Sequence, residues 1–303
     1  MSELRLFNLN GTYVEEAHAK AYQLERDVQS LFESNLETLL GVRFVASEFV
    51  AGAGNRIDTL GLDENNFPVV IEYKLDKNRT VINQGVAYLL WIKNNQAEFW
   101  KAALNKLGKD AADSIDFSTV RLICIAADFT RDDLGMYELM PSTIDLVRYR
   151  RFGDGHLLLE RITSTAKNSG PAPSTPQATA QKAGTDKSMA QWLADQTAET
   201  KALFEAIRTS VLAQGDDIAE RETKLSISFR RSRNFASLTY ASRGEFCLYL
   251  HLDPSEVEMR EGLRDVSKIG HWGTGDLEVR IKSQKDVDDA TTLISRAYEG
   301  GQP

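Results

Sequence analysis

Two carboxylates and a lysine are the side chains of this 303-residue chain best suited to hydrolytic chemistry. Asp58 follows an Arg-Ile pair, and Glu72 and Lys74 follow further on, with thirteen residues between the two acids. Carboxylate oxygens are the ligands that hard divalent cations prefer, and a neighbouring lysine can orient a water molecule or stabilise negative charge on phosphorus. These residue types in this order indicate a metal-assisted hydrolase site.

The local sequence predicts how the two acids meet. Residues 56–63 and 67–71 have the composition of strands, and the polar segment 64–66 between them is typical of a turn. If the turn is centred on Asn65, Asp58 lies directly opposite Glu72, with Cβ atoms about 4.5–5.5 Å apart. Like charges so placed repel each other, so a cation is expected between them. The alternative is that these are solvated strand residues, as in most chance matches to so short a pattern.

A helix is expected ahead of this hairpin, over residues 14–40 with a break near 34–35. Its buried stripe follows the helical period and consists of Leu24, Val28, Leu31 and Phe32. Glu25 points within about 20° of Phe32, at the border of the stripe, whereas Glu33 is expected to point into solvent. Glu25 can therefore reach a neighbouring sheet, or it is a solvated acid in the first turn.

A second helix is expected over residues 80–93, where Gln84 and Tyr88 share one face of a largely apolar segment. Buried amide and hydroxyl groups need hydrogen-bond partners, which either a carboxylate–metal site or ordinary packing can supply. Further strands are expected at 43–50, 120–127 and 144–150. The fold class is therefore α/β, a mixed sheet core flanked by helices.

Composition divides the chain into two domains. A stretch rich in Pro, Ala, Ser and Thr predicts a flexible linker at 166–188, between domains at 1–165 and 189–303. In the second domain, helices at 191–214 and 286–298 enclose strands at 224–229, 235–240, 245–250 and 277–281, which predicts a smaller α+β fold. Cys124 and Cys247 lie in apolar segments and are expected to be packing residues.

Charge and hydropathy limit the partners. The chain lacks both a long apolar run and a signal-peptide start, so we expect a cytoplasmic protein with no membrane partner. The net charge is −8, and residues 1–165 carry 18 Lys and Arg against 24 Asp and Glu. Nucleic acid would then need a local basic rim. Its candidates in the first domain, for which solvated surface is the alternative, are Lys77, Arg79, Arg148 and Arg150. Arg230, Arg231 and Arg233 are candidates in the second domain, and their alternative is a charged hairpin turn flanked by core aromatics.

Five motifs follow one another in the first half of the chain. They are Leu24–Val28, Leu40–Phe49, Arg56–Gly61, Ile71–Lys74 and Asn83–Tyr88. In this order they resemble the catalytic domain of NucS-type endonucleases, a branch of the PD-(D/E)XK superfamily with a restriction-endonuclease-like fold. The similarity spans roughly residues 10–150, and Ile57 stands where proline usually precedes the first acid.

The resemblance implies a role for each site residue. Asp58, Glu72 and Glu25 would bind Mg²⁺ or Mn²⁺, and Lys74 would position or activate the attacking water. Gln84 and Tyr88 would contact the region of the scissile phosphate. The implied activity is that of a DNA endonuclease acting in repair or against foreign DNA.

Several matters stay open at this point. RNA remains an alternative substrate, and a homodimer is compatible with cutting both strands. The C-terminal domain resembles an uncharacterised domain labelled predicted transport protein. A hypothesis of another class is a non-catalytic module that retains the nuclease fold and binds nucleic acid or protein.

Overall fold

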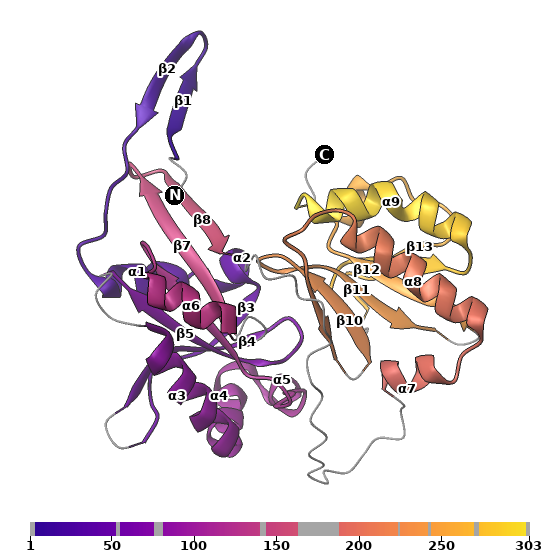
Figure 1. Ribbon diagram of the computed structural model, residues 1–303, viewed down its shortest axis with the longest axis horizontal. Coiled ribbons are helices and arrows are strands. Elements are labelled where there is room, and N and C mark those ends of the chain that lie inside the picture. The colour runs from indigo at the N-terminus through magenta and orange to yellow at the C-terminus, as the bar shows by residue number, and fades with distance from the viewer. Residues whose placement is uncertain are drawn as a thin grey trace. The chain divides into compact units, whose positions relative to one another are not determined.

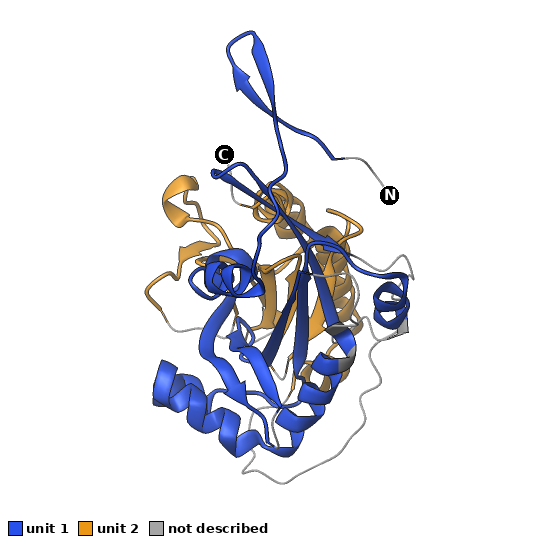
Figure 2. Cartoon of the chain, turned by 90° about the vertical axis from the view of Figure 1, so that its left-hand side faces the viewer, with its two compact units in different colours: residues 1–174 blue, residues 175–303 orange. Residues whose placement is uncertain are grey.

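The chain forms two compact units, residues 1–174 and 175–303, in the computed structural model (Figure 2). The structure describes residues 4–52, 55–75, 81–139, 144–162, 188–223, 225–241, 244–269 and 273–300. The division between the units falls within the segment 166–188 that the composition indicates as a linker, most of which lies outside the described residues.

The core of the first unit is a six-stranded mixed sheet with the order β3-β4-β5-β6-β7-β8 (Figure 1). The β5–β6 and β6–β7 pairs are parallel, and the other neighbours are antiparallel. The predicted α/β fold with a mixed sheet and flanking helices is therefore confirmed. The strands are β3 Val42–Val50, β4 Arg56–Asp63, β5 Pro68–Lys74, β6 Arg121–Ala126, β7 Ile144–Phe152 and β8 His156–Ile162.

Helices cover both faces of this sheet because its central strands are apolar on both sides. Val70 and Leu122 pack with α3 and α4, whereas the next residues along, Ile71 and Ile123, pack with α1 and α2. The helices of this unit are α1 Glu25–Glu33, α2 Leu36–Leu40, α3 Val81–Asn94, α4 Gln96–Leu107, α5 Lys109–Asp113 and α6 Arg131–Leu139.

The expectation of helix from residue 14 is wrong. Two strands, β1 Leu6–Asn10 and β2 Tyr13–Ala17, form a hairpin, and α1 begins only at Glu25. Gly11 adopts φ 64° in the two-residue turn, a conformation that hairpin turns require and glycine adopts without strain. The apolar stripe of α1 also begins only near Leu24, so residues 14–23 lack the apolar periodicity of a helix.

The second unit is an antiparallel six-stranded sheet with the order β13-β14-β12-β11-β10-β9. Phe246, Leu248 and Leu250 alternate along β12 and pack with α8 and α9 in one apolar core. The elements are α7 Met189–Ala194, α8 Ala198–Leu212, β9 Ala219–Glu222, β10 Ser226–Arg230, β11 Asn234–Tyr240, β12 Phe246–Leu250, the 3₁₀ turn Pro254–Glu256, β13 Leu263–Asp265, β14 Leu277–Ile281 and α9 Gln284–Tyr298.

The single helix expected at 191–214 is two helices, because Thr197 caps α8. Its side chain accepts a hydrogen bond from the backbone N–H of Thr200, which is the arrangement of a helix start. No helix in the described part of the chain is long and apolar enough to span a membrane.

Candidate active site

The β4–β5 hairpin brings Asp58 and Glu72 together. Its ladder pairs Thr59 with Ile71 and Leu62 with Pro68, which is the register predicted for a turn centred on Asn65. One position beyond the ladder, the Asp58 N–H donates to Glu72 Oε1 at 3.3 Å, and the Tyr73 N–H donates to Asp58 Oδ2 at 3.0 Å. Each carboxylate thus lies against the backbone of the opposite strand, at the end of β5.

Burial makes two negative charges costly at this place. Glu72 is only 2% exposed, and burial, followed by the neighbouring charge of Asp58, raises its pKa to about 8. Asp58 is half-buried, and burial likewise raises its pKa to about 6. A bound cation would stabilise both ionised forms. This pair therefore suits a hard divalent metal such as Mg²⁺ or Mn²⁺, which binds carboxylate oxygens.

Lys74 lies beside the pair and contacts Glu25. Its Nζ donates to Glu25 Oε1 at 3.3 Å, and its charge lowers the pKa of both Asp58 and Glu72, though less than burial raises them. Among the described residues, no group of three or more His, Cys, Asp or Glu side chains is arranged to hold a metal. Asp58 and Glu72 are thus the pair best placed as ligands, and Glu25 as a third ligand stays a prediction.

A polar network on α1 supports Asp58 from behind, and the sequence analysis missed it. Gln29 Nε2 donates to the Asp58 carbonyl at 3.0 Å, to Glu33 Oε1 at 3.0 Å and to Ser47 Oγ at 3.2 Å. Glu33 also accepts from Thr59 Oγ1 at 2.6 Å, so the expectation that it points into solvent is wrong.

The physical reason for that correction is the direction of α1. Glu25, Gln29 and Glu33 are spaced by four residues and form one face of α1, which lies against β4 and β5. The buried hydroxyl of Thr59 and the amide of Gln29 require an acceptor there, and Glu33 supplies it. The spacing of four was the signal that could have revealed the network.

The two α3 residues occupy different environments. The Tyr88 hydroxyl is 2.8 Å from the Arg56 carbonyl and donates to it, which ties α3 to the start of β4. Burial and then the charges of Glu72 and Asp58 raise the pKa of Tyr88, so its ring is close to the acid pair. Gln84 is exposed one turn earlier on α3. Their contact with a scissile phosphate stays a prediction.

Arg148 lies at the same end of the parallel strands as Lys74. Lys74 pairs with Ala126, and Ala126 pairs with Arg148, so the three residues form one row across β5, β6 and β7. Arg148 is held by Asp128 at 2.9 Å and by Glu160 at 2.8 Å. Arg150 follows on the same face of β7 and is half-buried. Lys77 and Arg79 lie outside the described residues.

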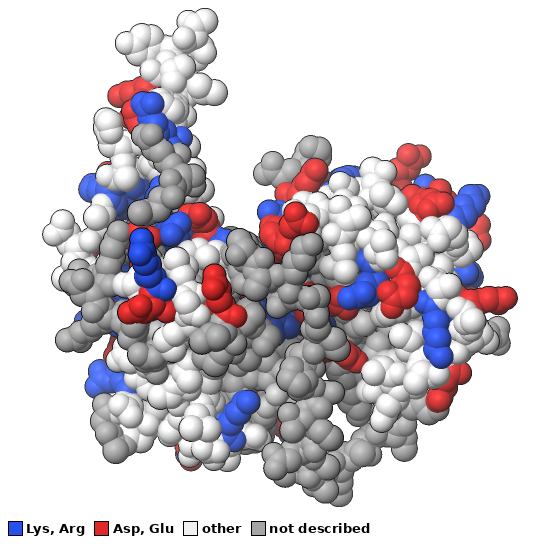
Figure 3. Space-filling view, viewed as in Figure 1, with Lys and Arg blue, Asp and Glu red and all other residues white. Residues whose placement is uncertain are grey.

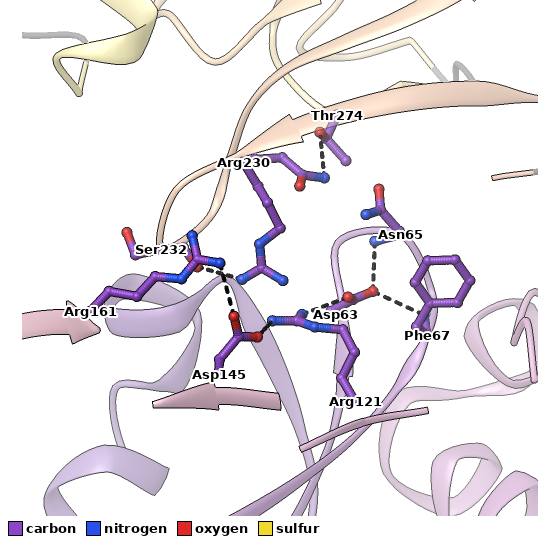
Figure 4. Close-up of polar contacts among 10 residues, drawn as sticks. Asp63, Asn65, Phe67, Arg121, Asp145, Arg161, Arg230, Ser232 and Thr274 are labelled. Carbon is purple, nitrogen blue, oxygen red and sulfur yellow. Dashed lines mark hydrogen bonds and ion pairs between the residues drawn. The ribbon is translucent and has the colours of Figure 1, made fainter. Parts of the chain in front are cut away.

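The three arginines of the second unit flank the β10–β11 turn. Arg231 pairs with Asp217 at 2.7 Å and lies 4.4 Å over the ring of Tyr298, so it holds the turn against α9. Arg230 donates to the Ser232 carbonyl at 2.8 Å, and Arg233 is half-buried. Figure 4 includes Arg230 among the polar contacts of this turn. These contacts fit the structural alternative for Arg231, and the nucleic-acid role of all three stays a prediction.

A second buried charge cluster in the first unit also escaped the sequence analysis. Arg121 is 1% exposed and lies between Asp63 at 2.7 Å and Asp145 at 2.5 Å, and Arg161 contacts Asp145 at 3.0 Å (Figure 4). Asp63 ends β4 and Arg121 begins β6, so this cluster lies at the opposite end of the strands from Glu72 and Lys74.

Comparisons with known proteins match both parts of the chain. A family model described as a domain of unknown function (DUF5655) matches residues 189–300. An uncharacterised protein of Haemophilus influenzae is 27% identical over 310 residues, which span 98% of this chain and 100% of that protein. The two units therefore occur together in that relative.

Two solved structures each match 45% of this chain. One is a complex of EndoMS with dsDNA2, with a TM-score of 0.27 and 19% identity, and the other is a repair endonuclease from Pyrococcus abyssi, with a TM-score of 0.26 and 15% identity. The chain spans about half the length of each, 51% and 50% respectively. Likenesses at this level do not establish a function.

Proposed function

We propose that this protein is a divalent-metal-dependent endonuclease that hydrolyses phosphodiester bonds in DNA. The observation that carries the proposal is the acid pair itself. The half-buried Asp58 and the buried Glu72 lie side by side at the end of a sheet, and the positive charge of Lys74 lowers their pKa values less than burial raises them. A fold has little reason to keep two such carboxylates together unless a cation joins them.

The residues divide the chemistry between them. A divalent ion held there would lower the pKa of a bound water and neutralise charge on the phosphate. Asp58 and Glu72 would hold it, and Lys74 Nζ, two residues further along the same side of β5, would donate to the attacking water or to a phosphate oxygen. Glu25 keeps the Lys74 ammonium in place through its 3.3 Å contact. Gln29 restrains the backbone of Asp58 through its hydrogen bond to the Asp58 carbonyl.

Lys74 and Arg148, at the same end of the strands, could contact different phosphates of one polyanion. Arg148 lies in the row of Lys74, two strands away, which is roughly 10 Å at the usual spacing of neighbouring strands. That distance exceeds the separation of adjacent phosphates along one strand, so Arg148 would contact a phosphate beyond the scissile one. A substrate with several phosphates fits this spacing, and DNA is the substrate proposed here.

The test is Mg²⁺- or Mn²⁺-dependent cleavage of a panel of single-stranded, branched, mismatched and modified DNAs. Wild type should cleave at least one of them, and Glu72→Gln and Lys74→Ala should each reduce the rate by about 100-fold or more. Glu98→Gln, which changes an exposed acid on α4, is the matched control and should retain the wild-type rate.

The opposite result is equally clear. If wild type and Lys74→Ala behave alike on every substrate, the enzyme proposal fails. A non-catalytic binding module would then be the better description of the first unit, and an RNA panel treated in the same way tests the remaining substrate class.

A further inference from the structure

The two faces of the N-terminal hairpin carry different side chains. Directly opposed residues of an antiparallel pair project to the same side, so the pairing of Leu9 with Val14 and of Phe7 with Glu16 places these four side chains together. Arg5 joins them, with its guanidinium 4.9 Å over the Phe7 ring and 2.6 Å from Glu16. We call these five residues the hairpin face. The opposite face carries Leu6, Asn8, Asn10, Tyr13, Glu15 and Ala17.

The apolar residues of the hairpin face are open to solvent. Phe7 is 39% exposed, Leu9 75% and Val14 54%. Of the ten large apolar side chains that are exposed among the described residues, three belong to the hairpin face. Apolar exposure gathered in one place marks an interaction site, and an isolated two-stranded hairpin is marginally stable in water. A partner that covers this face would bury its apolar side chains and stabilise the hairpin.

Two backbone hydrogen bonds fix the base of the hairpin to the first unit, so the hairpin face does not fold back onto that unit. The Lys20 N–H donates to the Arg151 carbonyl at 2.8 Å, and the Gly153 N–H donates to the His18 carbonyl at 3.2 Å. Beyond this anchor, Figures 1 and 2 show β1 and β2 extending away from the other strands of the unit.

The charges of the hairpin favour one kind of partner. Residues 4–17 contain one arginine and two glutamates, a net charge of −1, which disfavours nucleic acid. The outer end of the hairpin is white in Figure 3, which means that no charged side chain is visible there. The hairpin face itself carries one cation and one anion beside its apolar residues. Such a surface is complementary to itself, as the interface of a twofold dimer must be.

We propose that the hairpin face is a dimer interface, packed against the same face of a second copy of this chain. A twofold axis parallel to the strands places β1 of one copy over β2 of the other. Leu9 then meets Val14 of the partner subunit, and Arg5 meets Glu16 of the partner subunit. Three apolar side chains from each copy cover less than the roughly 800 Å² per partner of a standard interface. The dimer is therefore weak and dissociates on dilution.

The first experiment is sedimentation velocity of the full chain across a dilution series. Wild type should pass from dimer to monomer on dilution. Leu9→Glu should remain a monomer at the highest concentration of the series, because a buried unpaired carboxylate opposes the interface. Tyr13→Glu is the matched control, because Tyr13 is also 75% exposed but lies on the other face, and it should dimerise as wild type does. A monomeric wild type, a dimeric Leu9→Glu or a monomeric Tyr13→Glu overturns the proposal.

The second experiment tests the contact between copies directly. Arg5→Glu places two acids on each hairpin face, and Glu16→Arg places two arginines on each, so each variant alone should be monomeric. An equimolar mixture of the two should dimerise, because each acidic face then meets a basic one. Failure of the mixture to dimerise would show that the Arg5–Glu16 pair acts only within one hairpin and would refute the twofold arrangement.

Discussion

The two ends of the first sheet bury charge in opposite ways. At one end, Arg121 and Arg161 lie among Asp63 and Asp145, so two cations balance two anions. At the other end, Lys74 contacts Glu25 and lies beside the carboxylates of Asp58 and Glu72. Buried charges are tolerated when they are paired and hydrogen-bonded, and the first cluster meets that condition within the protein. In the part of the chain that the structure describes, the second cluster has more carboxylates than cations in contact with them, as expected of a site that binds a cation.

The comparison also explains what each cluster does for the fold. Asp63 accepts hydrogen bonds from the backbone N–H groups of Asn65 and Phe67, both at 2.9 Å, and thereby shapes the β4–β5 turn. Arg121 ties that turn to β6 and, through Asp145, to β7. The balanced cluster thus stabilises the turn of the hairpin that sets Asp58 opposite Glu72. The balanced cluster therefore has a structural role, and the acid pair is left for chemistry.

Removing the cation of the balanced cluster should have the largest effect. Arg121→Met leaves Asp63 and Asp145 buried without a partner between them, which should lower the free energy of unfolding by about 3–5 kcal/mol. Urea denaturation followed by circular dichroism measures the loss. Lys101→Met, on the exposed surface of α4, is the control and should change stability little. An Arg121→Met protein as stable as wild type would break the contrast between the two ends.

Removing a charge from the unbalanced cluster should act in the opposite direction. The folded-state pKa of Glu72 is raised from 4.5 to about 8, so between these values the folded protein holds more protons than the unfolded chain. Stability contributed by the protonated group is therefore present at low pH and is lost as pH rises through the folded-state pKa. Without added metal, Glu72→Gln should be more stable than wild type at pH 8 by about 2 kcal/mol.

That prediction is checked by thermal or urea unfolding at pH 5 and pH 8 in the presence of a chelator. The gap between Glu72→Gln and wild type should widen from pH 5 to pH 8, because only wild type retains the titrating acid. A constant gap, or a destabilised Glu72→Gln at pH 8, would show that the acid pair is already compensated in the metal-free protein.

Gln29 should have the smallest of these effects. Gln29→Leu removes the amide that holds the Asp58 carbonyl, at a cost of about 1 kcal/mol in unfolding free energy. Because the Asp58 backbone then loses a restraint, metal-dependent cleavage should slow by about tenfold, with KM little changed. Ser47→Ala removes a different partner of Gln29 and should keep the wild-type rate. If the two variants cleave at equal rates, Gln29 contributes to packing and does not position Asp58.

The sequence predicted the acid pair because local rules decide the β4–β5 hairpin. The segment 64–66 is polar, Asn66 adopts φ 62° as asparagine in a turn can, and apolar strands flank it, so the register about Asn65 follows. Burial of Arg121 could not be predicted in the same way. Its two partners are 58 and 24 residues away in the chain, and a charged residue before an apolar run usually marks a strand end in solvent.

The sequence carries a signal against each of the two wrong expectations. The Asn10-Gly11 pair indicates a hairpin turn, and the apolar stripe of the helix starts only near Leu24. The angle between Glu33 and the apolar stripe predicts a solvent-facing side chain, but its spacing of four from Gln29 places it over the polar Thr59. A helix face that is polar can still be buried when the sheet beneath it is polar too.

The central claim is that the acid pair is a metal site, and calorimetric titration of the metal-free protein with Mn²⁺ tests it without any substrate. Wild type should bind at pH 7 and release protons, because the raised pKa of Glu72 keeps that carboxyl partly protonated until the metal arrives. Asp58→Asn and Glu72→Gln should each lose binding, while Glu98→Gln should keep it. Binding that survives in Glu72→Gln, or that is missing in wild type, would contradict the account.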